Sequence, residues 1–136
     1  MIIFEQLFLN SSLSFFESCL KWFVFSGIGL RLGSSGIKQI IDPGFTAAII
    51  FGIKDKKAYA LVKEIGFANV SFSLLALLSI VFSTFRIPAA ITGGTYFLLA
   101  GLLHVVKQKE SKKEVFAMIS DFFIAAILLL LILINI

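Results

Sequence analysis

Residues 115–135 form a long apolar run that strongly limits what this chain can fold into. Only Ser120, Asp121 and Asn135 interrupt its aliphatic and aromatic side chains. A helix of about 20 such residues spans the hydrocarbon core of a bilayer. The whole chain of 136 residues is 59% hydrophobic, and a soluble domain of this size leaves too much of its chain at the surface to hide that apolar area. The sequence therefore predicts an all-α integral membrane protein with a single domain, residues 1–136.

Four segments are predicted to cross the membrane and to pack as a four-transmembrane-helix bundle. They cover residues 13–41, 58–83, 87–106 and 115–135. The first is the least regular, because it carries four charged side chains and several glycines that favour a bend. Residues 44–52 are apolar but too short to cross, so we expect a re-entrant or interfacial segment there. Residues 1–12 are predicted to lie in the interface as a short amphipathic helix.

Lysines in the connections predict the orientation. The first and third connections hold Lys54, Lys56 and Lys57, and Lys107, Lys109, Lys112 and Lys113, whereas the second holds only Arg86. Positively charged loops stay in the cytoplasm. We therefore expect a multi-pass protein of the bacterial cytoplasmic (inner) membrane, with both lysine-rich loops in the cytoplasm and both termini on the non-cytoplasmic side. The net charge of +4 reflects these loops and not a nucleic-acid-binding surface.

Each predicted span carries an ionisable side chain in the same half of the bilayer. At a rise of 1.5 Å per residue, Glu64 and Asp121 lie roughly 10 Å from the cytoplasmic ends of their helices, and Arg31 lies about 15 Å from its own. His104 is slightly shallower. Such groups are rare in spans and usually face a partner or a water-filled cavity. These four residues are the predicted site for a ligand or a proton.

Two faces of the second predicted span carry small or polar residues. Helical phase places Glu64, Ala68 and Ser71 on one face, and Gly66, Asn69, Ser73 and Ala76 on another. This pattern predicts packing on both sides, with Asn69, Ser71 and Ser73 as polar helix-packing residues. The ionisable layer has a purely structural alternative as well, in which Arg31 forms an ion pair with either acid.

The sequence offers little support for catalysis. It contains no Gly-x-Ser-x-Gly nucleophile motif and no phosphate-binding loop, and Cys19 has no evident base. His104 and the carboxylates lack the close spacing typical of metal ligands. We therefore expect no catalytic residues, no metal and no cofactor, and a non-enzymatic function.

Several motifs in residues 58–136 resemble a known kind of membrane protein. Glu64-x-Gly-x-Ala-Asn69, Gly101-x-x-His104 and Asp121, which opens the last apolar helix, are similar to a family of small bacterial four-helix membrane proteins classed as a domain of unknown function. This chain has Gln39-Ile-Ile where that family tends to carry a Gly-His pair, which argues against metal or haem ligation. More remotely, the layout resembles DoxX-like proteins, some of which are membrane subunits of quinone-linked oxidoreductases.

Three functions remain open at this point. The leading hypothesis is a non-enzymatic protein that binds or conducts a proton, an ion or a small polar solute through a cytoplasmic-side cavity lined by Glu64, His104 and Asp121, with Arg31 neutralising the acids. A DoxX-like subunit of a quinone-linked redox system and a purely structural or partner-stabilising subunit are the alternatives. The expected partners are the lipid bilayer, the solute or ion, and further copies or subunits in an oligomer or membrane complex, but not nucleic acid.

Overall fold

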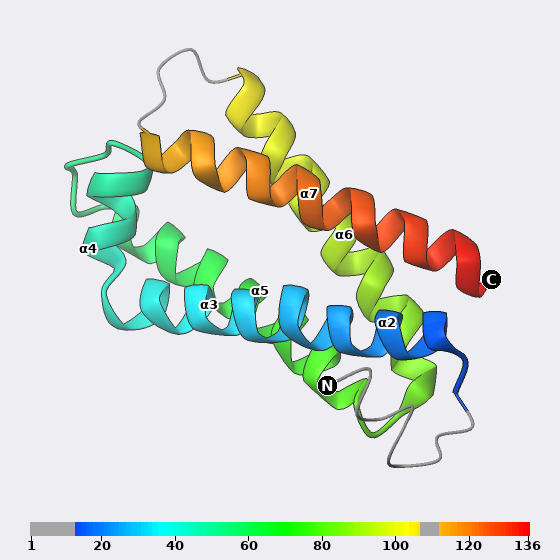
Figure 1. Cartoon of the computed structure of the whole chain (residues 1–136). Coiled ribbons are helices and arrows are strands. Elements are labelled where there is room, and N and C mark those ends of the chain that lie inside the picture. The colour runs from blue at the N-terminus through cyan, green and yellow to red at the C-terminus, as the bar shows by residue number, and fades with distance from the viewer. Residues whose placement is uncertain (1–12, 107–111) are drawn as a thin grey trace.

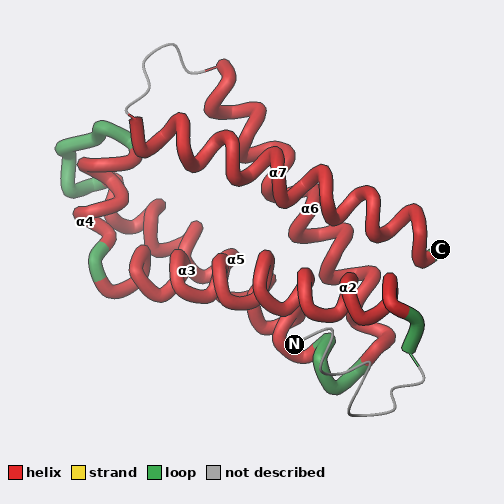
Figure 2. The backbone as a smooth tube through the Cα atoms, viewed as in Figure 1, coloured by secondary structure: helices red, strands yellow, loops and turns green. Residues whose placement is uncertain are grey.

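The computed structural model describes residues 13–106 and 112–136, and every regular element in this part of the chain is helical (Figures 1 and 2). The interfacial helix predicted for residues 1–12 and most of the third connection, residues 107–111, lie outside the described residues. The elements are α2 (Phe15–Phe23), η1 (Val24–Leu30), α3 (Arg31–Ile41), α4 (Pro43–Phe45), η2 (Thr46–Ile50), α5 (Ala58–Leu78), η3 (Ser83–Phe85), α6 (Arg86–Val106) and α7 (Lys112–Asn135).

Residues 15–41 form one long helical stretch whose middle part is wider than an α-helix. The stretch begins at a capping box, in which Ser14 and Glu17 satisfy each other's backbone N–H groups. Its central segment η1 is a π-helix, a form with i→i+5 hydrogen bonds. The Gly29 carbonyl of this segment accepts a hydrogen bond of 2.6 Å from the Ser73 hydroxyl on α5. The predicted irregularity of the first span is therefore a π segment anchored to α5.

Three helices of the described residues are long and apolar enough to cross a membrane. They cover Ala58–Leu78, Ser83–Val106 and Glu114–Asn135. Large apolar side chains are exposed along all three, for example Leu74, Leu99 and Leu133 at 56%, 60% and 67%. These helices support the predicted all-α class and a multi-pass membrane protein.

The structure corrects the predicted end of one segment. The second span was predicted to reach Ser83, but α5 ends at Leu78. The chain turns there because the Ser79 hydroxyl bonds to the Ala76 carbonyl at 2.6 Å and Arg86 Nε bonds to the Ser79 carbonyl at 3.3 Å, which satisfies groups that a helix end leaves open. Residues 44–52 are mostly helical, as α4 and η2, and pack against α5.

The helices are arranged as two closely packed pairs. α3 packs along α5, and α6 packs along α7, whereas α2 and η1 contact α5, α6 and α7 and so join the two pairs. The pairs lie together at the α2 end of the molecule and separate toward the α4 end (Figure 1). This divergence leaves room between them at the α4 end.

The hydrophobic core lies where the pairs meet. Val24 and Ile28 of the first helical stretch, Phe97 of α6 and Leu128 of α7 are at most 2% exposed. Their burial fixes the α2 end as the closed end of the molecule.

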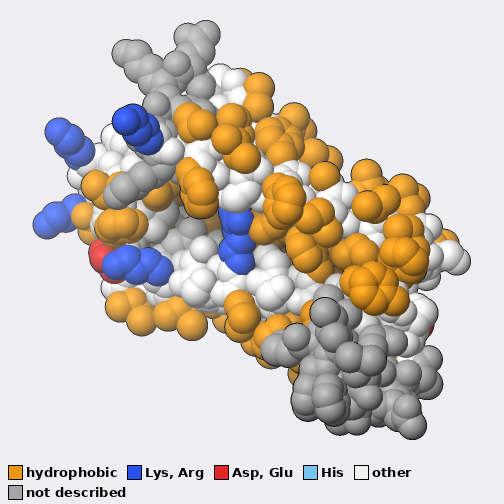
Figure 3. Space-filling model, in the orientation of Figure 1, with side chains coloured by type: hydrophobic (Ala, Val, Ile, Leu, Met, Phe, Trp, Pro, Cys, Tyr) orange, Lys and Arg blue, Asp and Glu red, His pale blue; other side chains and the backbone are white. Residues whose placement is uncertain are grey.

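Basic side chains gather at one end of the face drawn in Figure 3, whereas apolar side chains are spread over most of it. Figure 3 shows orange apolar side chains over α6 and α7, and blue basic side chains gathered at the α4 end. Lys54, Lys56 and Lys57 are exposed there. A basic group is also visible in a hollow between the apolar surfaces (Figure 3).

The α3–α5 contact generates a stability prediction. A Cβ atom at Gly36 would lie 2.7 Å from the Gly66 carbonyl oxygen and 2.8 Å from Val70 Cγ2. Backbone cannot move aside as a flexible side chain can, so we expect Gly36→Ala to lower the free energy of unfolding by about 1–3 kcal/mol. Thermal unfolding of the purified protein in detergent measures this effect.

Gly94→Ala is the matched control, since a Cβ there meets only Leu128 at 3.6 Å. The added methyl group should leave stability unchanged or raise it by up to about 1 kcal/mol through helix propensity. Equal melting temperatures for Gly36→Ala and Gly94→Ala would contradict the close α3–α5 approach.

Candidate functional site

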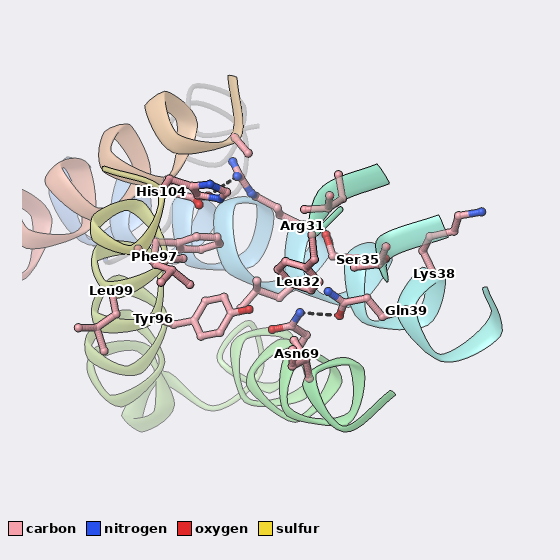
Figure 4. A pocket seen from close by; sticks show the side chains of 18 of the residues that line it. Arg31, Leu32, Ser35, Lys38, Gln39, Asn69, Tyr96, Phe97, Leu99 and His104 are labelled. Carbon is pink, nitrogen blue, oxygen red and sulfur yellow. Dashed lines mark hydrogen bonds and ion pairs between the residues drawn. The ribbon is translucent and has the colours of Figure 1, made fainter. Parts of the chain in front are cut away.

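A cleft of about 600 Å³ lies between the two helix pairs at the α4 end. α3 and α5 form one wall, α6 and α7 form the other, and α4 and η2 contribute residues at the end. Figure 4 shows Gln39, Asn69 and Tyr96 pointing toward one another from α3, α5 and α6, whereas Lys38 and Leu99 point away from them. Its volume falls in the range of roughly 300–1,000 Å³ that is common for small-molecule sites.

The strongest polar feature of the cleft is an ion pair between the helix pairs. Arg31 begins α3, and its Nη2 donates to Asp121 Oδ1 at 2.5 Å and to the Ser120 hydroxyl oxygen at 2.9 Å. The Arg31 guanidinium carbon also lies 4.9 Å from the centre of the Phe97 ring, a favourable cation–π geometry. Asp121 is 8% exposed at its side chain, whereas Arg31 is 31% exposed.

Part of the Arg31 guanidinium is available to a ligand. Its hydrogen bonds to described residues all use Nη2, so Nε and Nη1 have no acceptor in that part of the chain. An arginine side chain has five N–H donors in a planar fork. The group can therefore keep its pair with Asp121 and still donate to an oxygen atom in the cleft.

His104 lies in the same cleft. It is half-buried near the end of α6, on the same side of the cleft as Arg31 (Figure 4). It also interacts electrostatically with Asp121. Arg31, His104 and Asp121, which come from three different helices, are thus brought together.

A second polar group lies deeper between α3, α5 and α6. Asn69 is 2% exposed, and its Nδ2 donates to Gln39 Oε1 at 2.8 Å (Figure 4). Its Oδ1 is buried without a hydrogen-bond partner among the described residues. The Tyr96 hydroxyl points toward the Asn69 side chain (Figure 4), so Tyr96 is the donor placed nearest to this oxygen.

The remaining cation of the lining is already paired. Lys38 Nζ lies 2.7 Å from Asp42 Oδ2. The Lys38 hydrogen bond, followed by one from the Phe45 N–H, holds the pKa of the Asp42 carboxyl below its usual range. Lys38 and Asp42 therefore form an ion pair at neutral pH, at the exposed end of the cleft.

Glu64 is not part of the cleft. It is exposed on α5, as are Ala68 and Ser71, whereas Gly66 and Asn69 on the opposite face are buried. The Ser71 hydroxyl bonds to the Phe67 carbonyl of its own helix, at 2.9 Å, while Ser73 is buried against η1. The predicted set is thus divided, with Glu64 on the outer surface and the other three residues inside.

The described residues contain no group of three or more His, Cys, Asp or Glu side chains close enough to hold a metal ion.

Sequence reasoning missed four residues that line the cleft: Lys38, Gln39, Tyr96 and Phe97. Tyr96 carried a signal that could have been used, because it is a polar side chain in a largely apolar predicted span, whereas Gln39 lies in a predicted span that already carries four charged side chains. Phe97 carried none, because the chain has 16 Phe residues.

A comparison with protein families identifies relatives at the family level. No curated protein and no solved structure matches the chain. A family profile described as "Family of unknown function (DUF6790)" matches residues 2–136, nearly the whole sequence. On the basis of this match, the chain belongs to the DUF6790 family.

Proposed function

We propose that this protein is a non-enzymatic small-molecule binder of the bacterial cytoplasmic membrane, with its site in the cleft between the helix pairs. The observation that carries this proposal is the Arg31–Asp121 pair, which leaves guanidinium donors facing a cavity. A purely structural ion pair has no need of an adjoining cavity of about 600 Å³. Intramembrane charges that face a cavity commonly mark a ligand or ion path.

Retention of a bound molecule tests the proposal directly. Wild-type protein in lipid nanodiscs, analysed by native mass spectrometry, should carry a small molecule retained from the host membrane. The double substitution Arg31→Met with Asp121→Leu should lose it. Because this variant removes both charges together, neither is left buried alone, and such replacements are often neutral or stabilising.

Arg86→Met is the matched control, since Arg86 is at the opposite end of the molecule, at the start of α6. This variant should retain the bound molecule. Retention of the same bound small molecule by the wild type and the double variant would contradict a ligand site in the cleft.

The proposal includes four spans, with residues 15–41 as the first of them. This stretch contacts α5, α6 and α7, and its α2 end lies beside the end of α7, where Asn135 Nδ2 approaches the Phe16 carbonyl at 3.4 Å. The exposed lysines of the α4 end support its placement in the cytoplasm. Both termini would then be outside.

Cysteine labelling tests this topology. In a Cys19→Ser background, Thr84→Cys should react with a membrane-impermeant maleimide in intact spheroplasts. Lys54→Cys should react only after permeabilisation, because the two exposed positions lie at opposite ends of α5. The reverse pattern would contradict the proposed orientation.

The two acids are expected to differ in their contribution to stability. Asp121→Asn weakens a charged hydrogen-bonded pair and should lower the free energy of unfolding by about 1–3 kcal/mol. Glu64 is exposed, so Glu64→Gln should change the free energy of unfolding by less than about 0.5 kcal/mol. Thermal unfolding in detergent compares the two variants, and an equal loss would show that Glu64 has an interior partner.

A structural role has one observation in its favour. A carboxylate on the outward face of a membrane span is unfavourable in lipid, and exposed Ala68 and Ser71 beside Glu64 would let another helix approach closely. Oligomerisation, or packing in a membrane complex, therefore belongs to the proposal. Loss of a co-purifying partner or a smaller assembly in Glu64→Gln would favour this second function.

A further inference from the structure

We propose that the cleft takes a neutral, membrane-dissolved amphiphile that enters sideways between α5 and α6 and places a carbonyl oxygen on Arg31. This inference rests on the proposed function, since it specifies the ligand class of the same site. It follows from where the cleft opens, from its charge balance and from its lining.

The cleft borders the bilayer through apolar side chains. Leu99 and Leu103 of α6 line it and are 60% and 61% exposed. Ile65 of α5 is also part of the lining. The connection between α5 and α6, residues 79–85, lies at the other end of both helices, so no loop joins them beside the cleft. A molecule dissolved in the bilayer would therefore meet apolar side chains of both helices on its way in.

The fixed charges of the lining cancel. Arg31 is paired with Asp121, and Lys38 is paired with Asp42. Among the other described residues of the lining, His104 and Tyr96 carry the remaining titratable groups. A carboxylate on Arg31 would lie close to Asp121, and two like charges in one site disfavour each other. A neutral carbonyl oxygen can accept from Nε or Nη1 without adding charge.

The rest of the lining suits an apolar body. Leu32, Phe45, Ile50, Phe51 and Phe97 contribute to its surface. A small, densely hydrated solute would leave these side chains without apolar contact, whereas a hydrocarbon or ring portion would cover them. The polar groups are concentrated in the Arg31–Asp121–His104 and Gln39–Asn69–Tyr96 sets. The ligand should therefore have a short polar head and a larger apolar part.

A pair of probes with the same alkyl chain, one with a neutral ester head and one with a carboxylate head, tests the ligand class. Wild-type protein in phosphatidylcholine nanodiscs is melted with increasing methyl dodecanoate or dodecanoate, above about pH 8, where the free acid is largely ionised. Binding to the native state raises the melting temperature with ligand concentration. We expect the ester to reach half of its maximal shift at a concentration about tenfold lower than the acid does.

Variants show whether the shift arises in the cleft. The double substitution Arg31→Met with Asp121→Leu should reduce the melting-temperature shift caused by methyl dodecanoate. The remaining shift should equal that caused by dodecane, which has no polar head group. Leu99→Trp, which fills the opening toward the lipid, should weaken the response to methyl dodecanoate as well. Leu129→Trp is the matched control, because Leu129 is likewise 60% exposed but lies outside the lining, and it should respond as the wild type does.

Tighter or equal binding of the acid would overturn the neutral-head inference, and so would the absence of any response to either probe. Neither result affects the cleft as a binding site, because that proposal depends on the molecule retained from the host membrane. The site itself would be contradicted if the Arg31→Met, Asp121→Leu variant still retained the molecule from the host membrane.

Discussion

The ion pair between Arg31 and Asp121 links two parts of the molecule that otherwise pack mainly within themselves. The residues are 90 positions apart, one at the start of α3 and the other in α7. They meet where the α3–α5 pair and the α6–α7 pair begin to separate. In a medium of low dielectric each charge alone would be unfavourable, so the contact fixes how far the pairs can diverge and keeps a polar group at the base of the space between them.

The cleft follows from an uneven distribution of close contacts. Gly36 and Gly66 bring α3 and α5 backbone to backbone, and Gly101 faces the Phe122 ring between α6 and α7. Both contacts lie within a pair. Between the pairs, Ile28 of η1 packs against Gly93 of α6 and belongs with Leu128 to the core cluster, which lies toward the α2 end. A cavity at the α4 end is the consequence of two tight pairs joined at one end.

Sequence reasoning predicted the helices better than their ends and faces. Apolar runs located α5, α6 and α7, but Ile80, Val81 and Phe82 extend the apolar run beyond the point where hydrogen bonds of Ser79 end α5. Helical phase separated the Glu64 face from the Asn69 face. It could not say which face another helix of the same chain would cover, because that depends on the neighbour.

Depth along a helix was a useful guide for the site and an insufficient one. It placed Arg31, Glu64, His104 and Asp121 in one layer, and the structure brings three of them into one cleft.

The π segment η1 explains part of what depth along the helix could not show. A π turn holds more residues than an α turn, so it changes the direction in which every later side chain of the helix points. In a relative with a regular α-helix there, the arginine that reaches the α7 carboxylate would have to occupy a neighbouring position in the chain. Equivalent arginines in this family are therefore better identified by their acidic partner than by their aligned position.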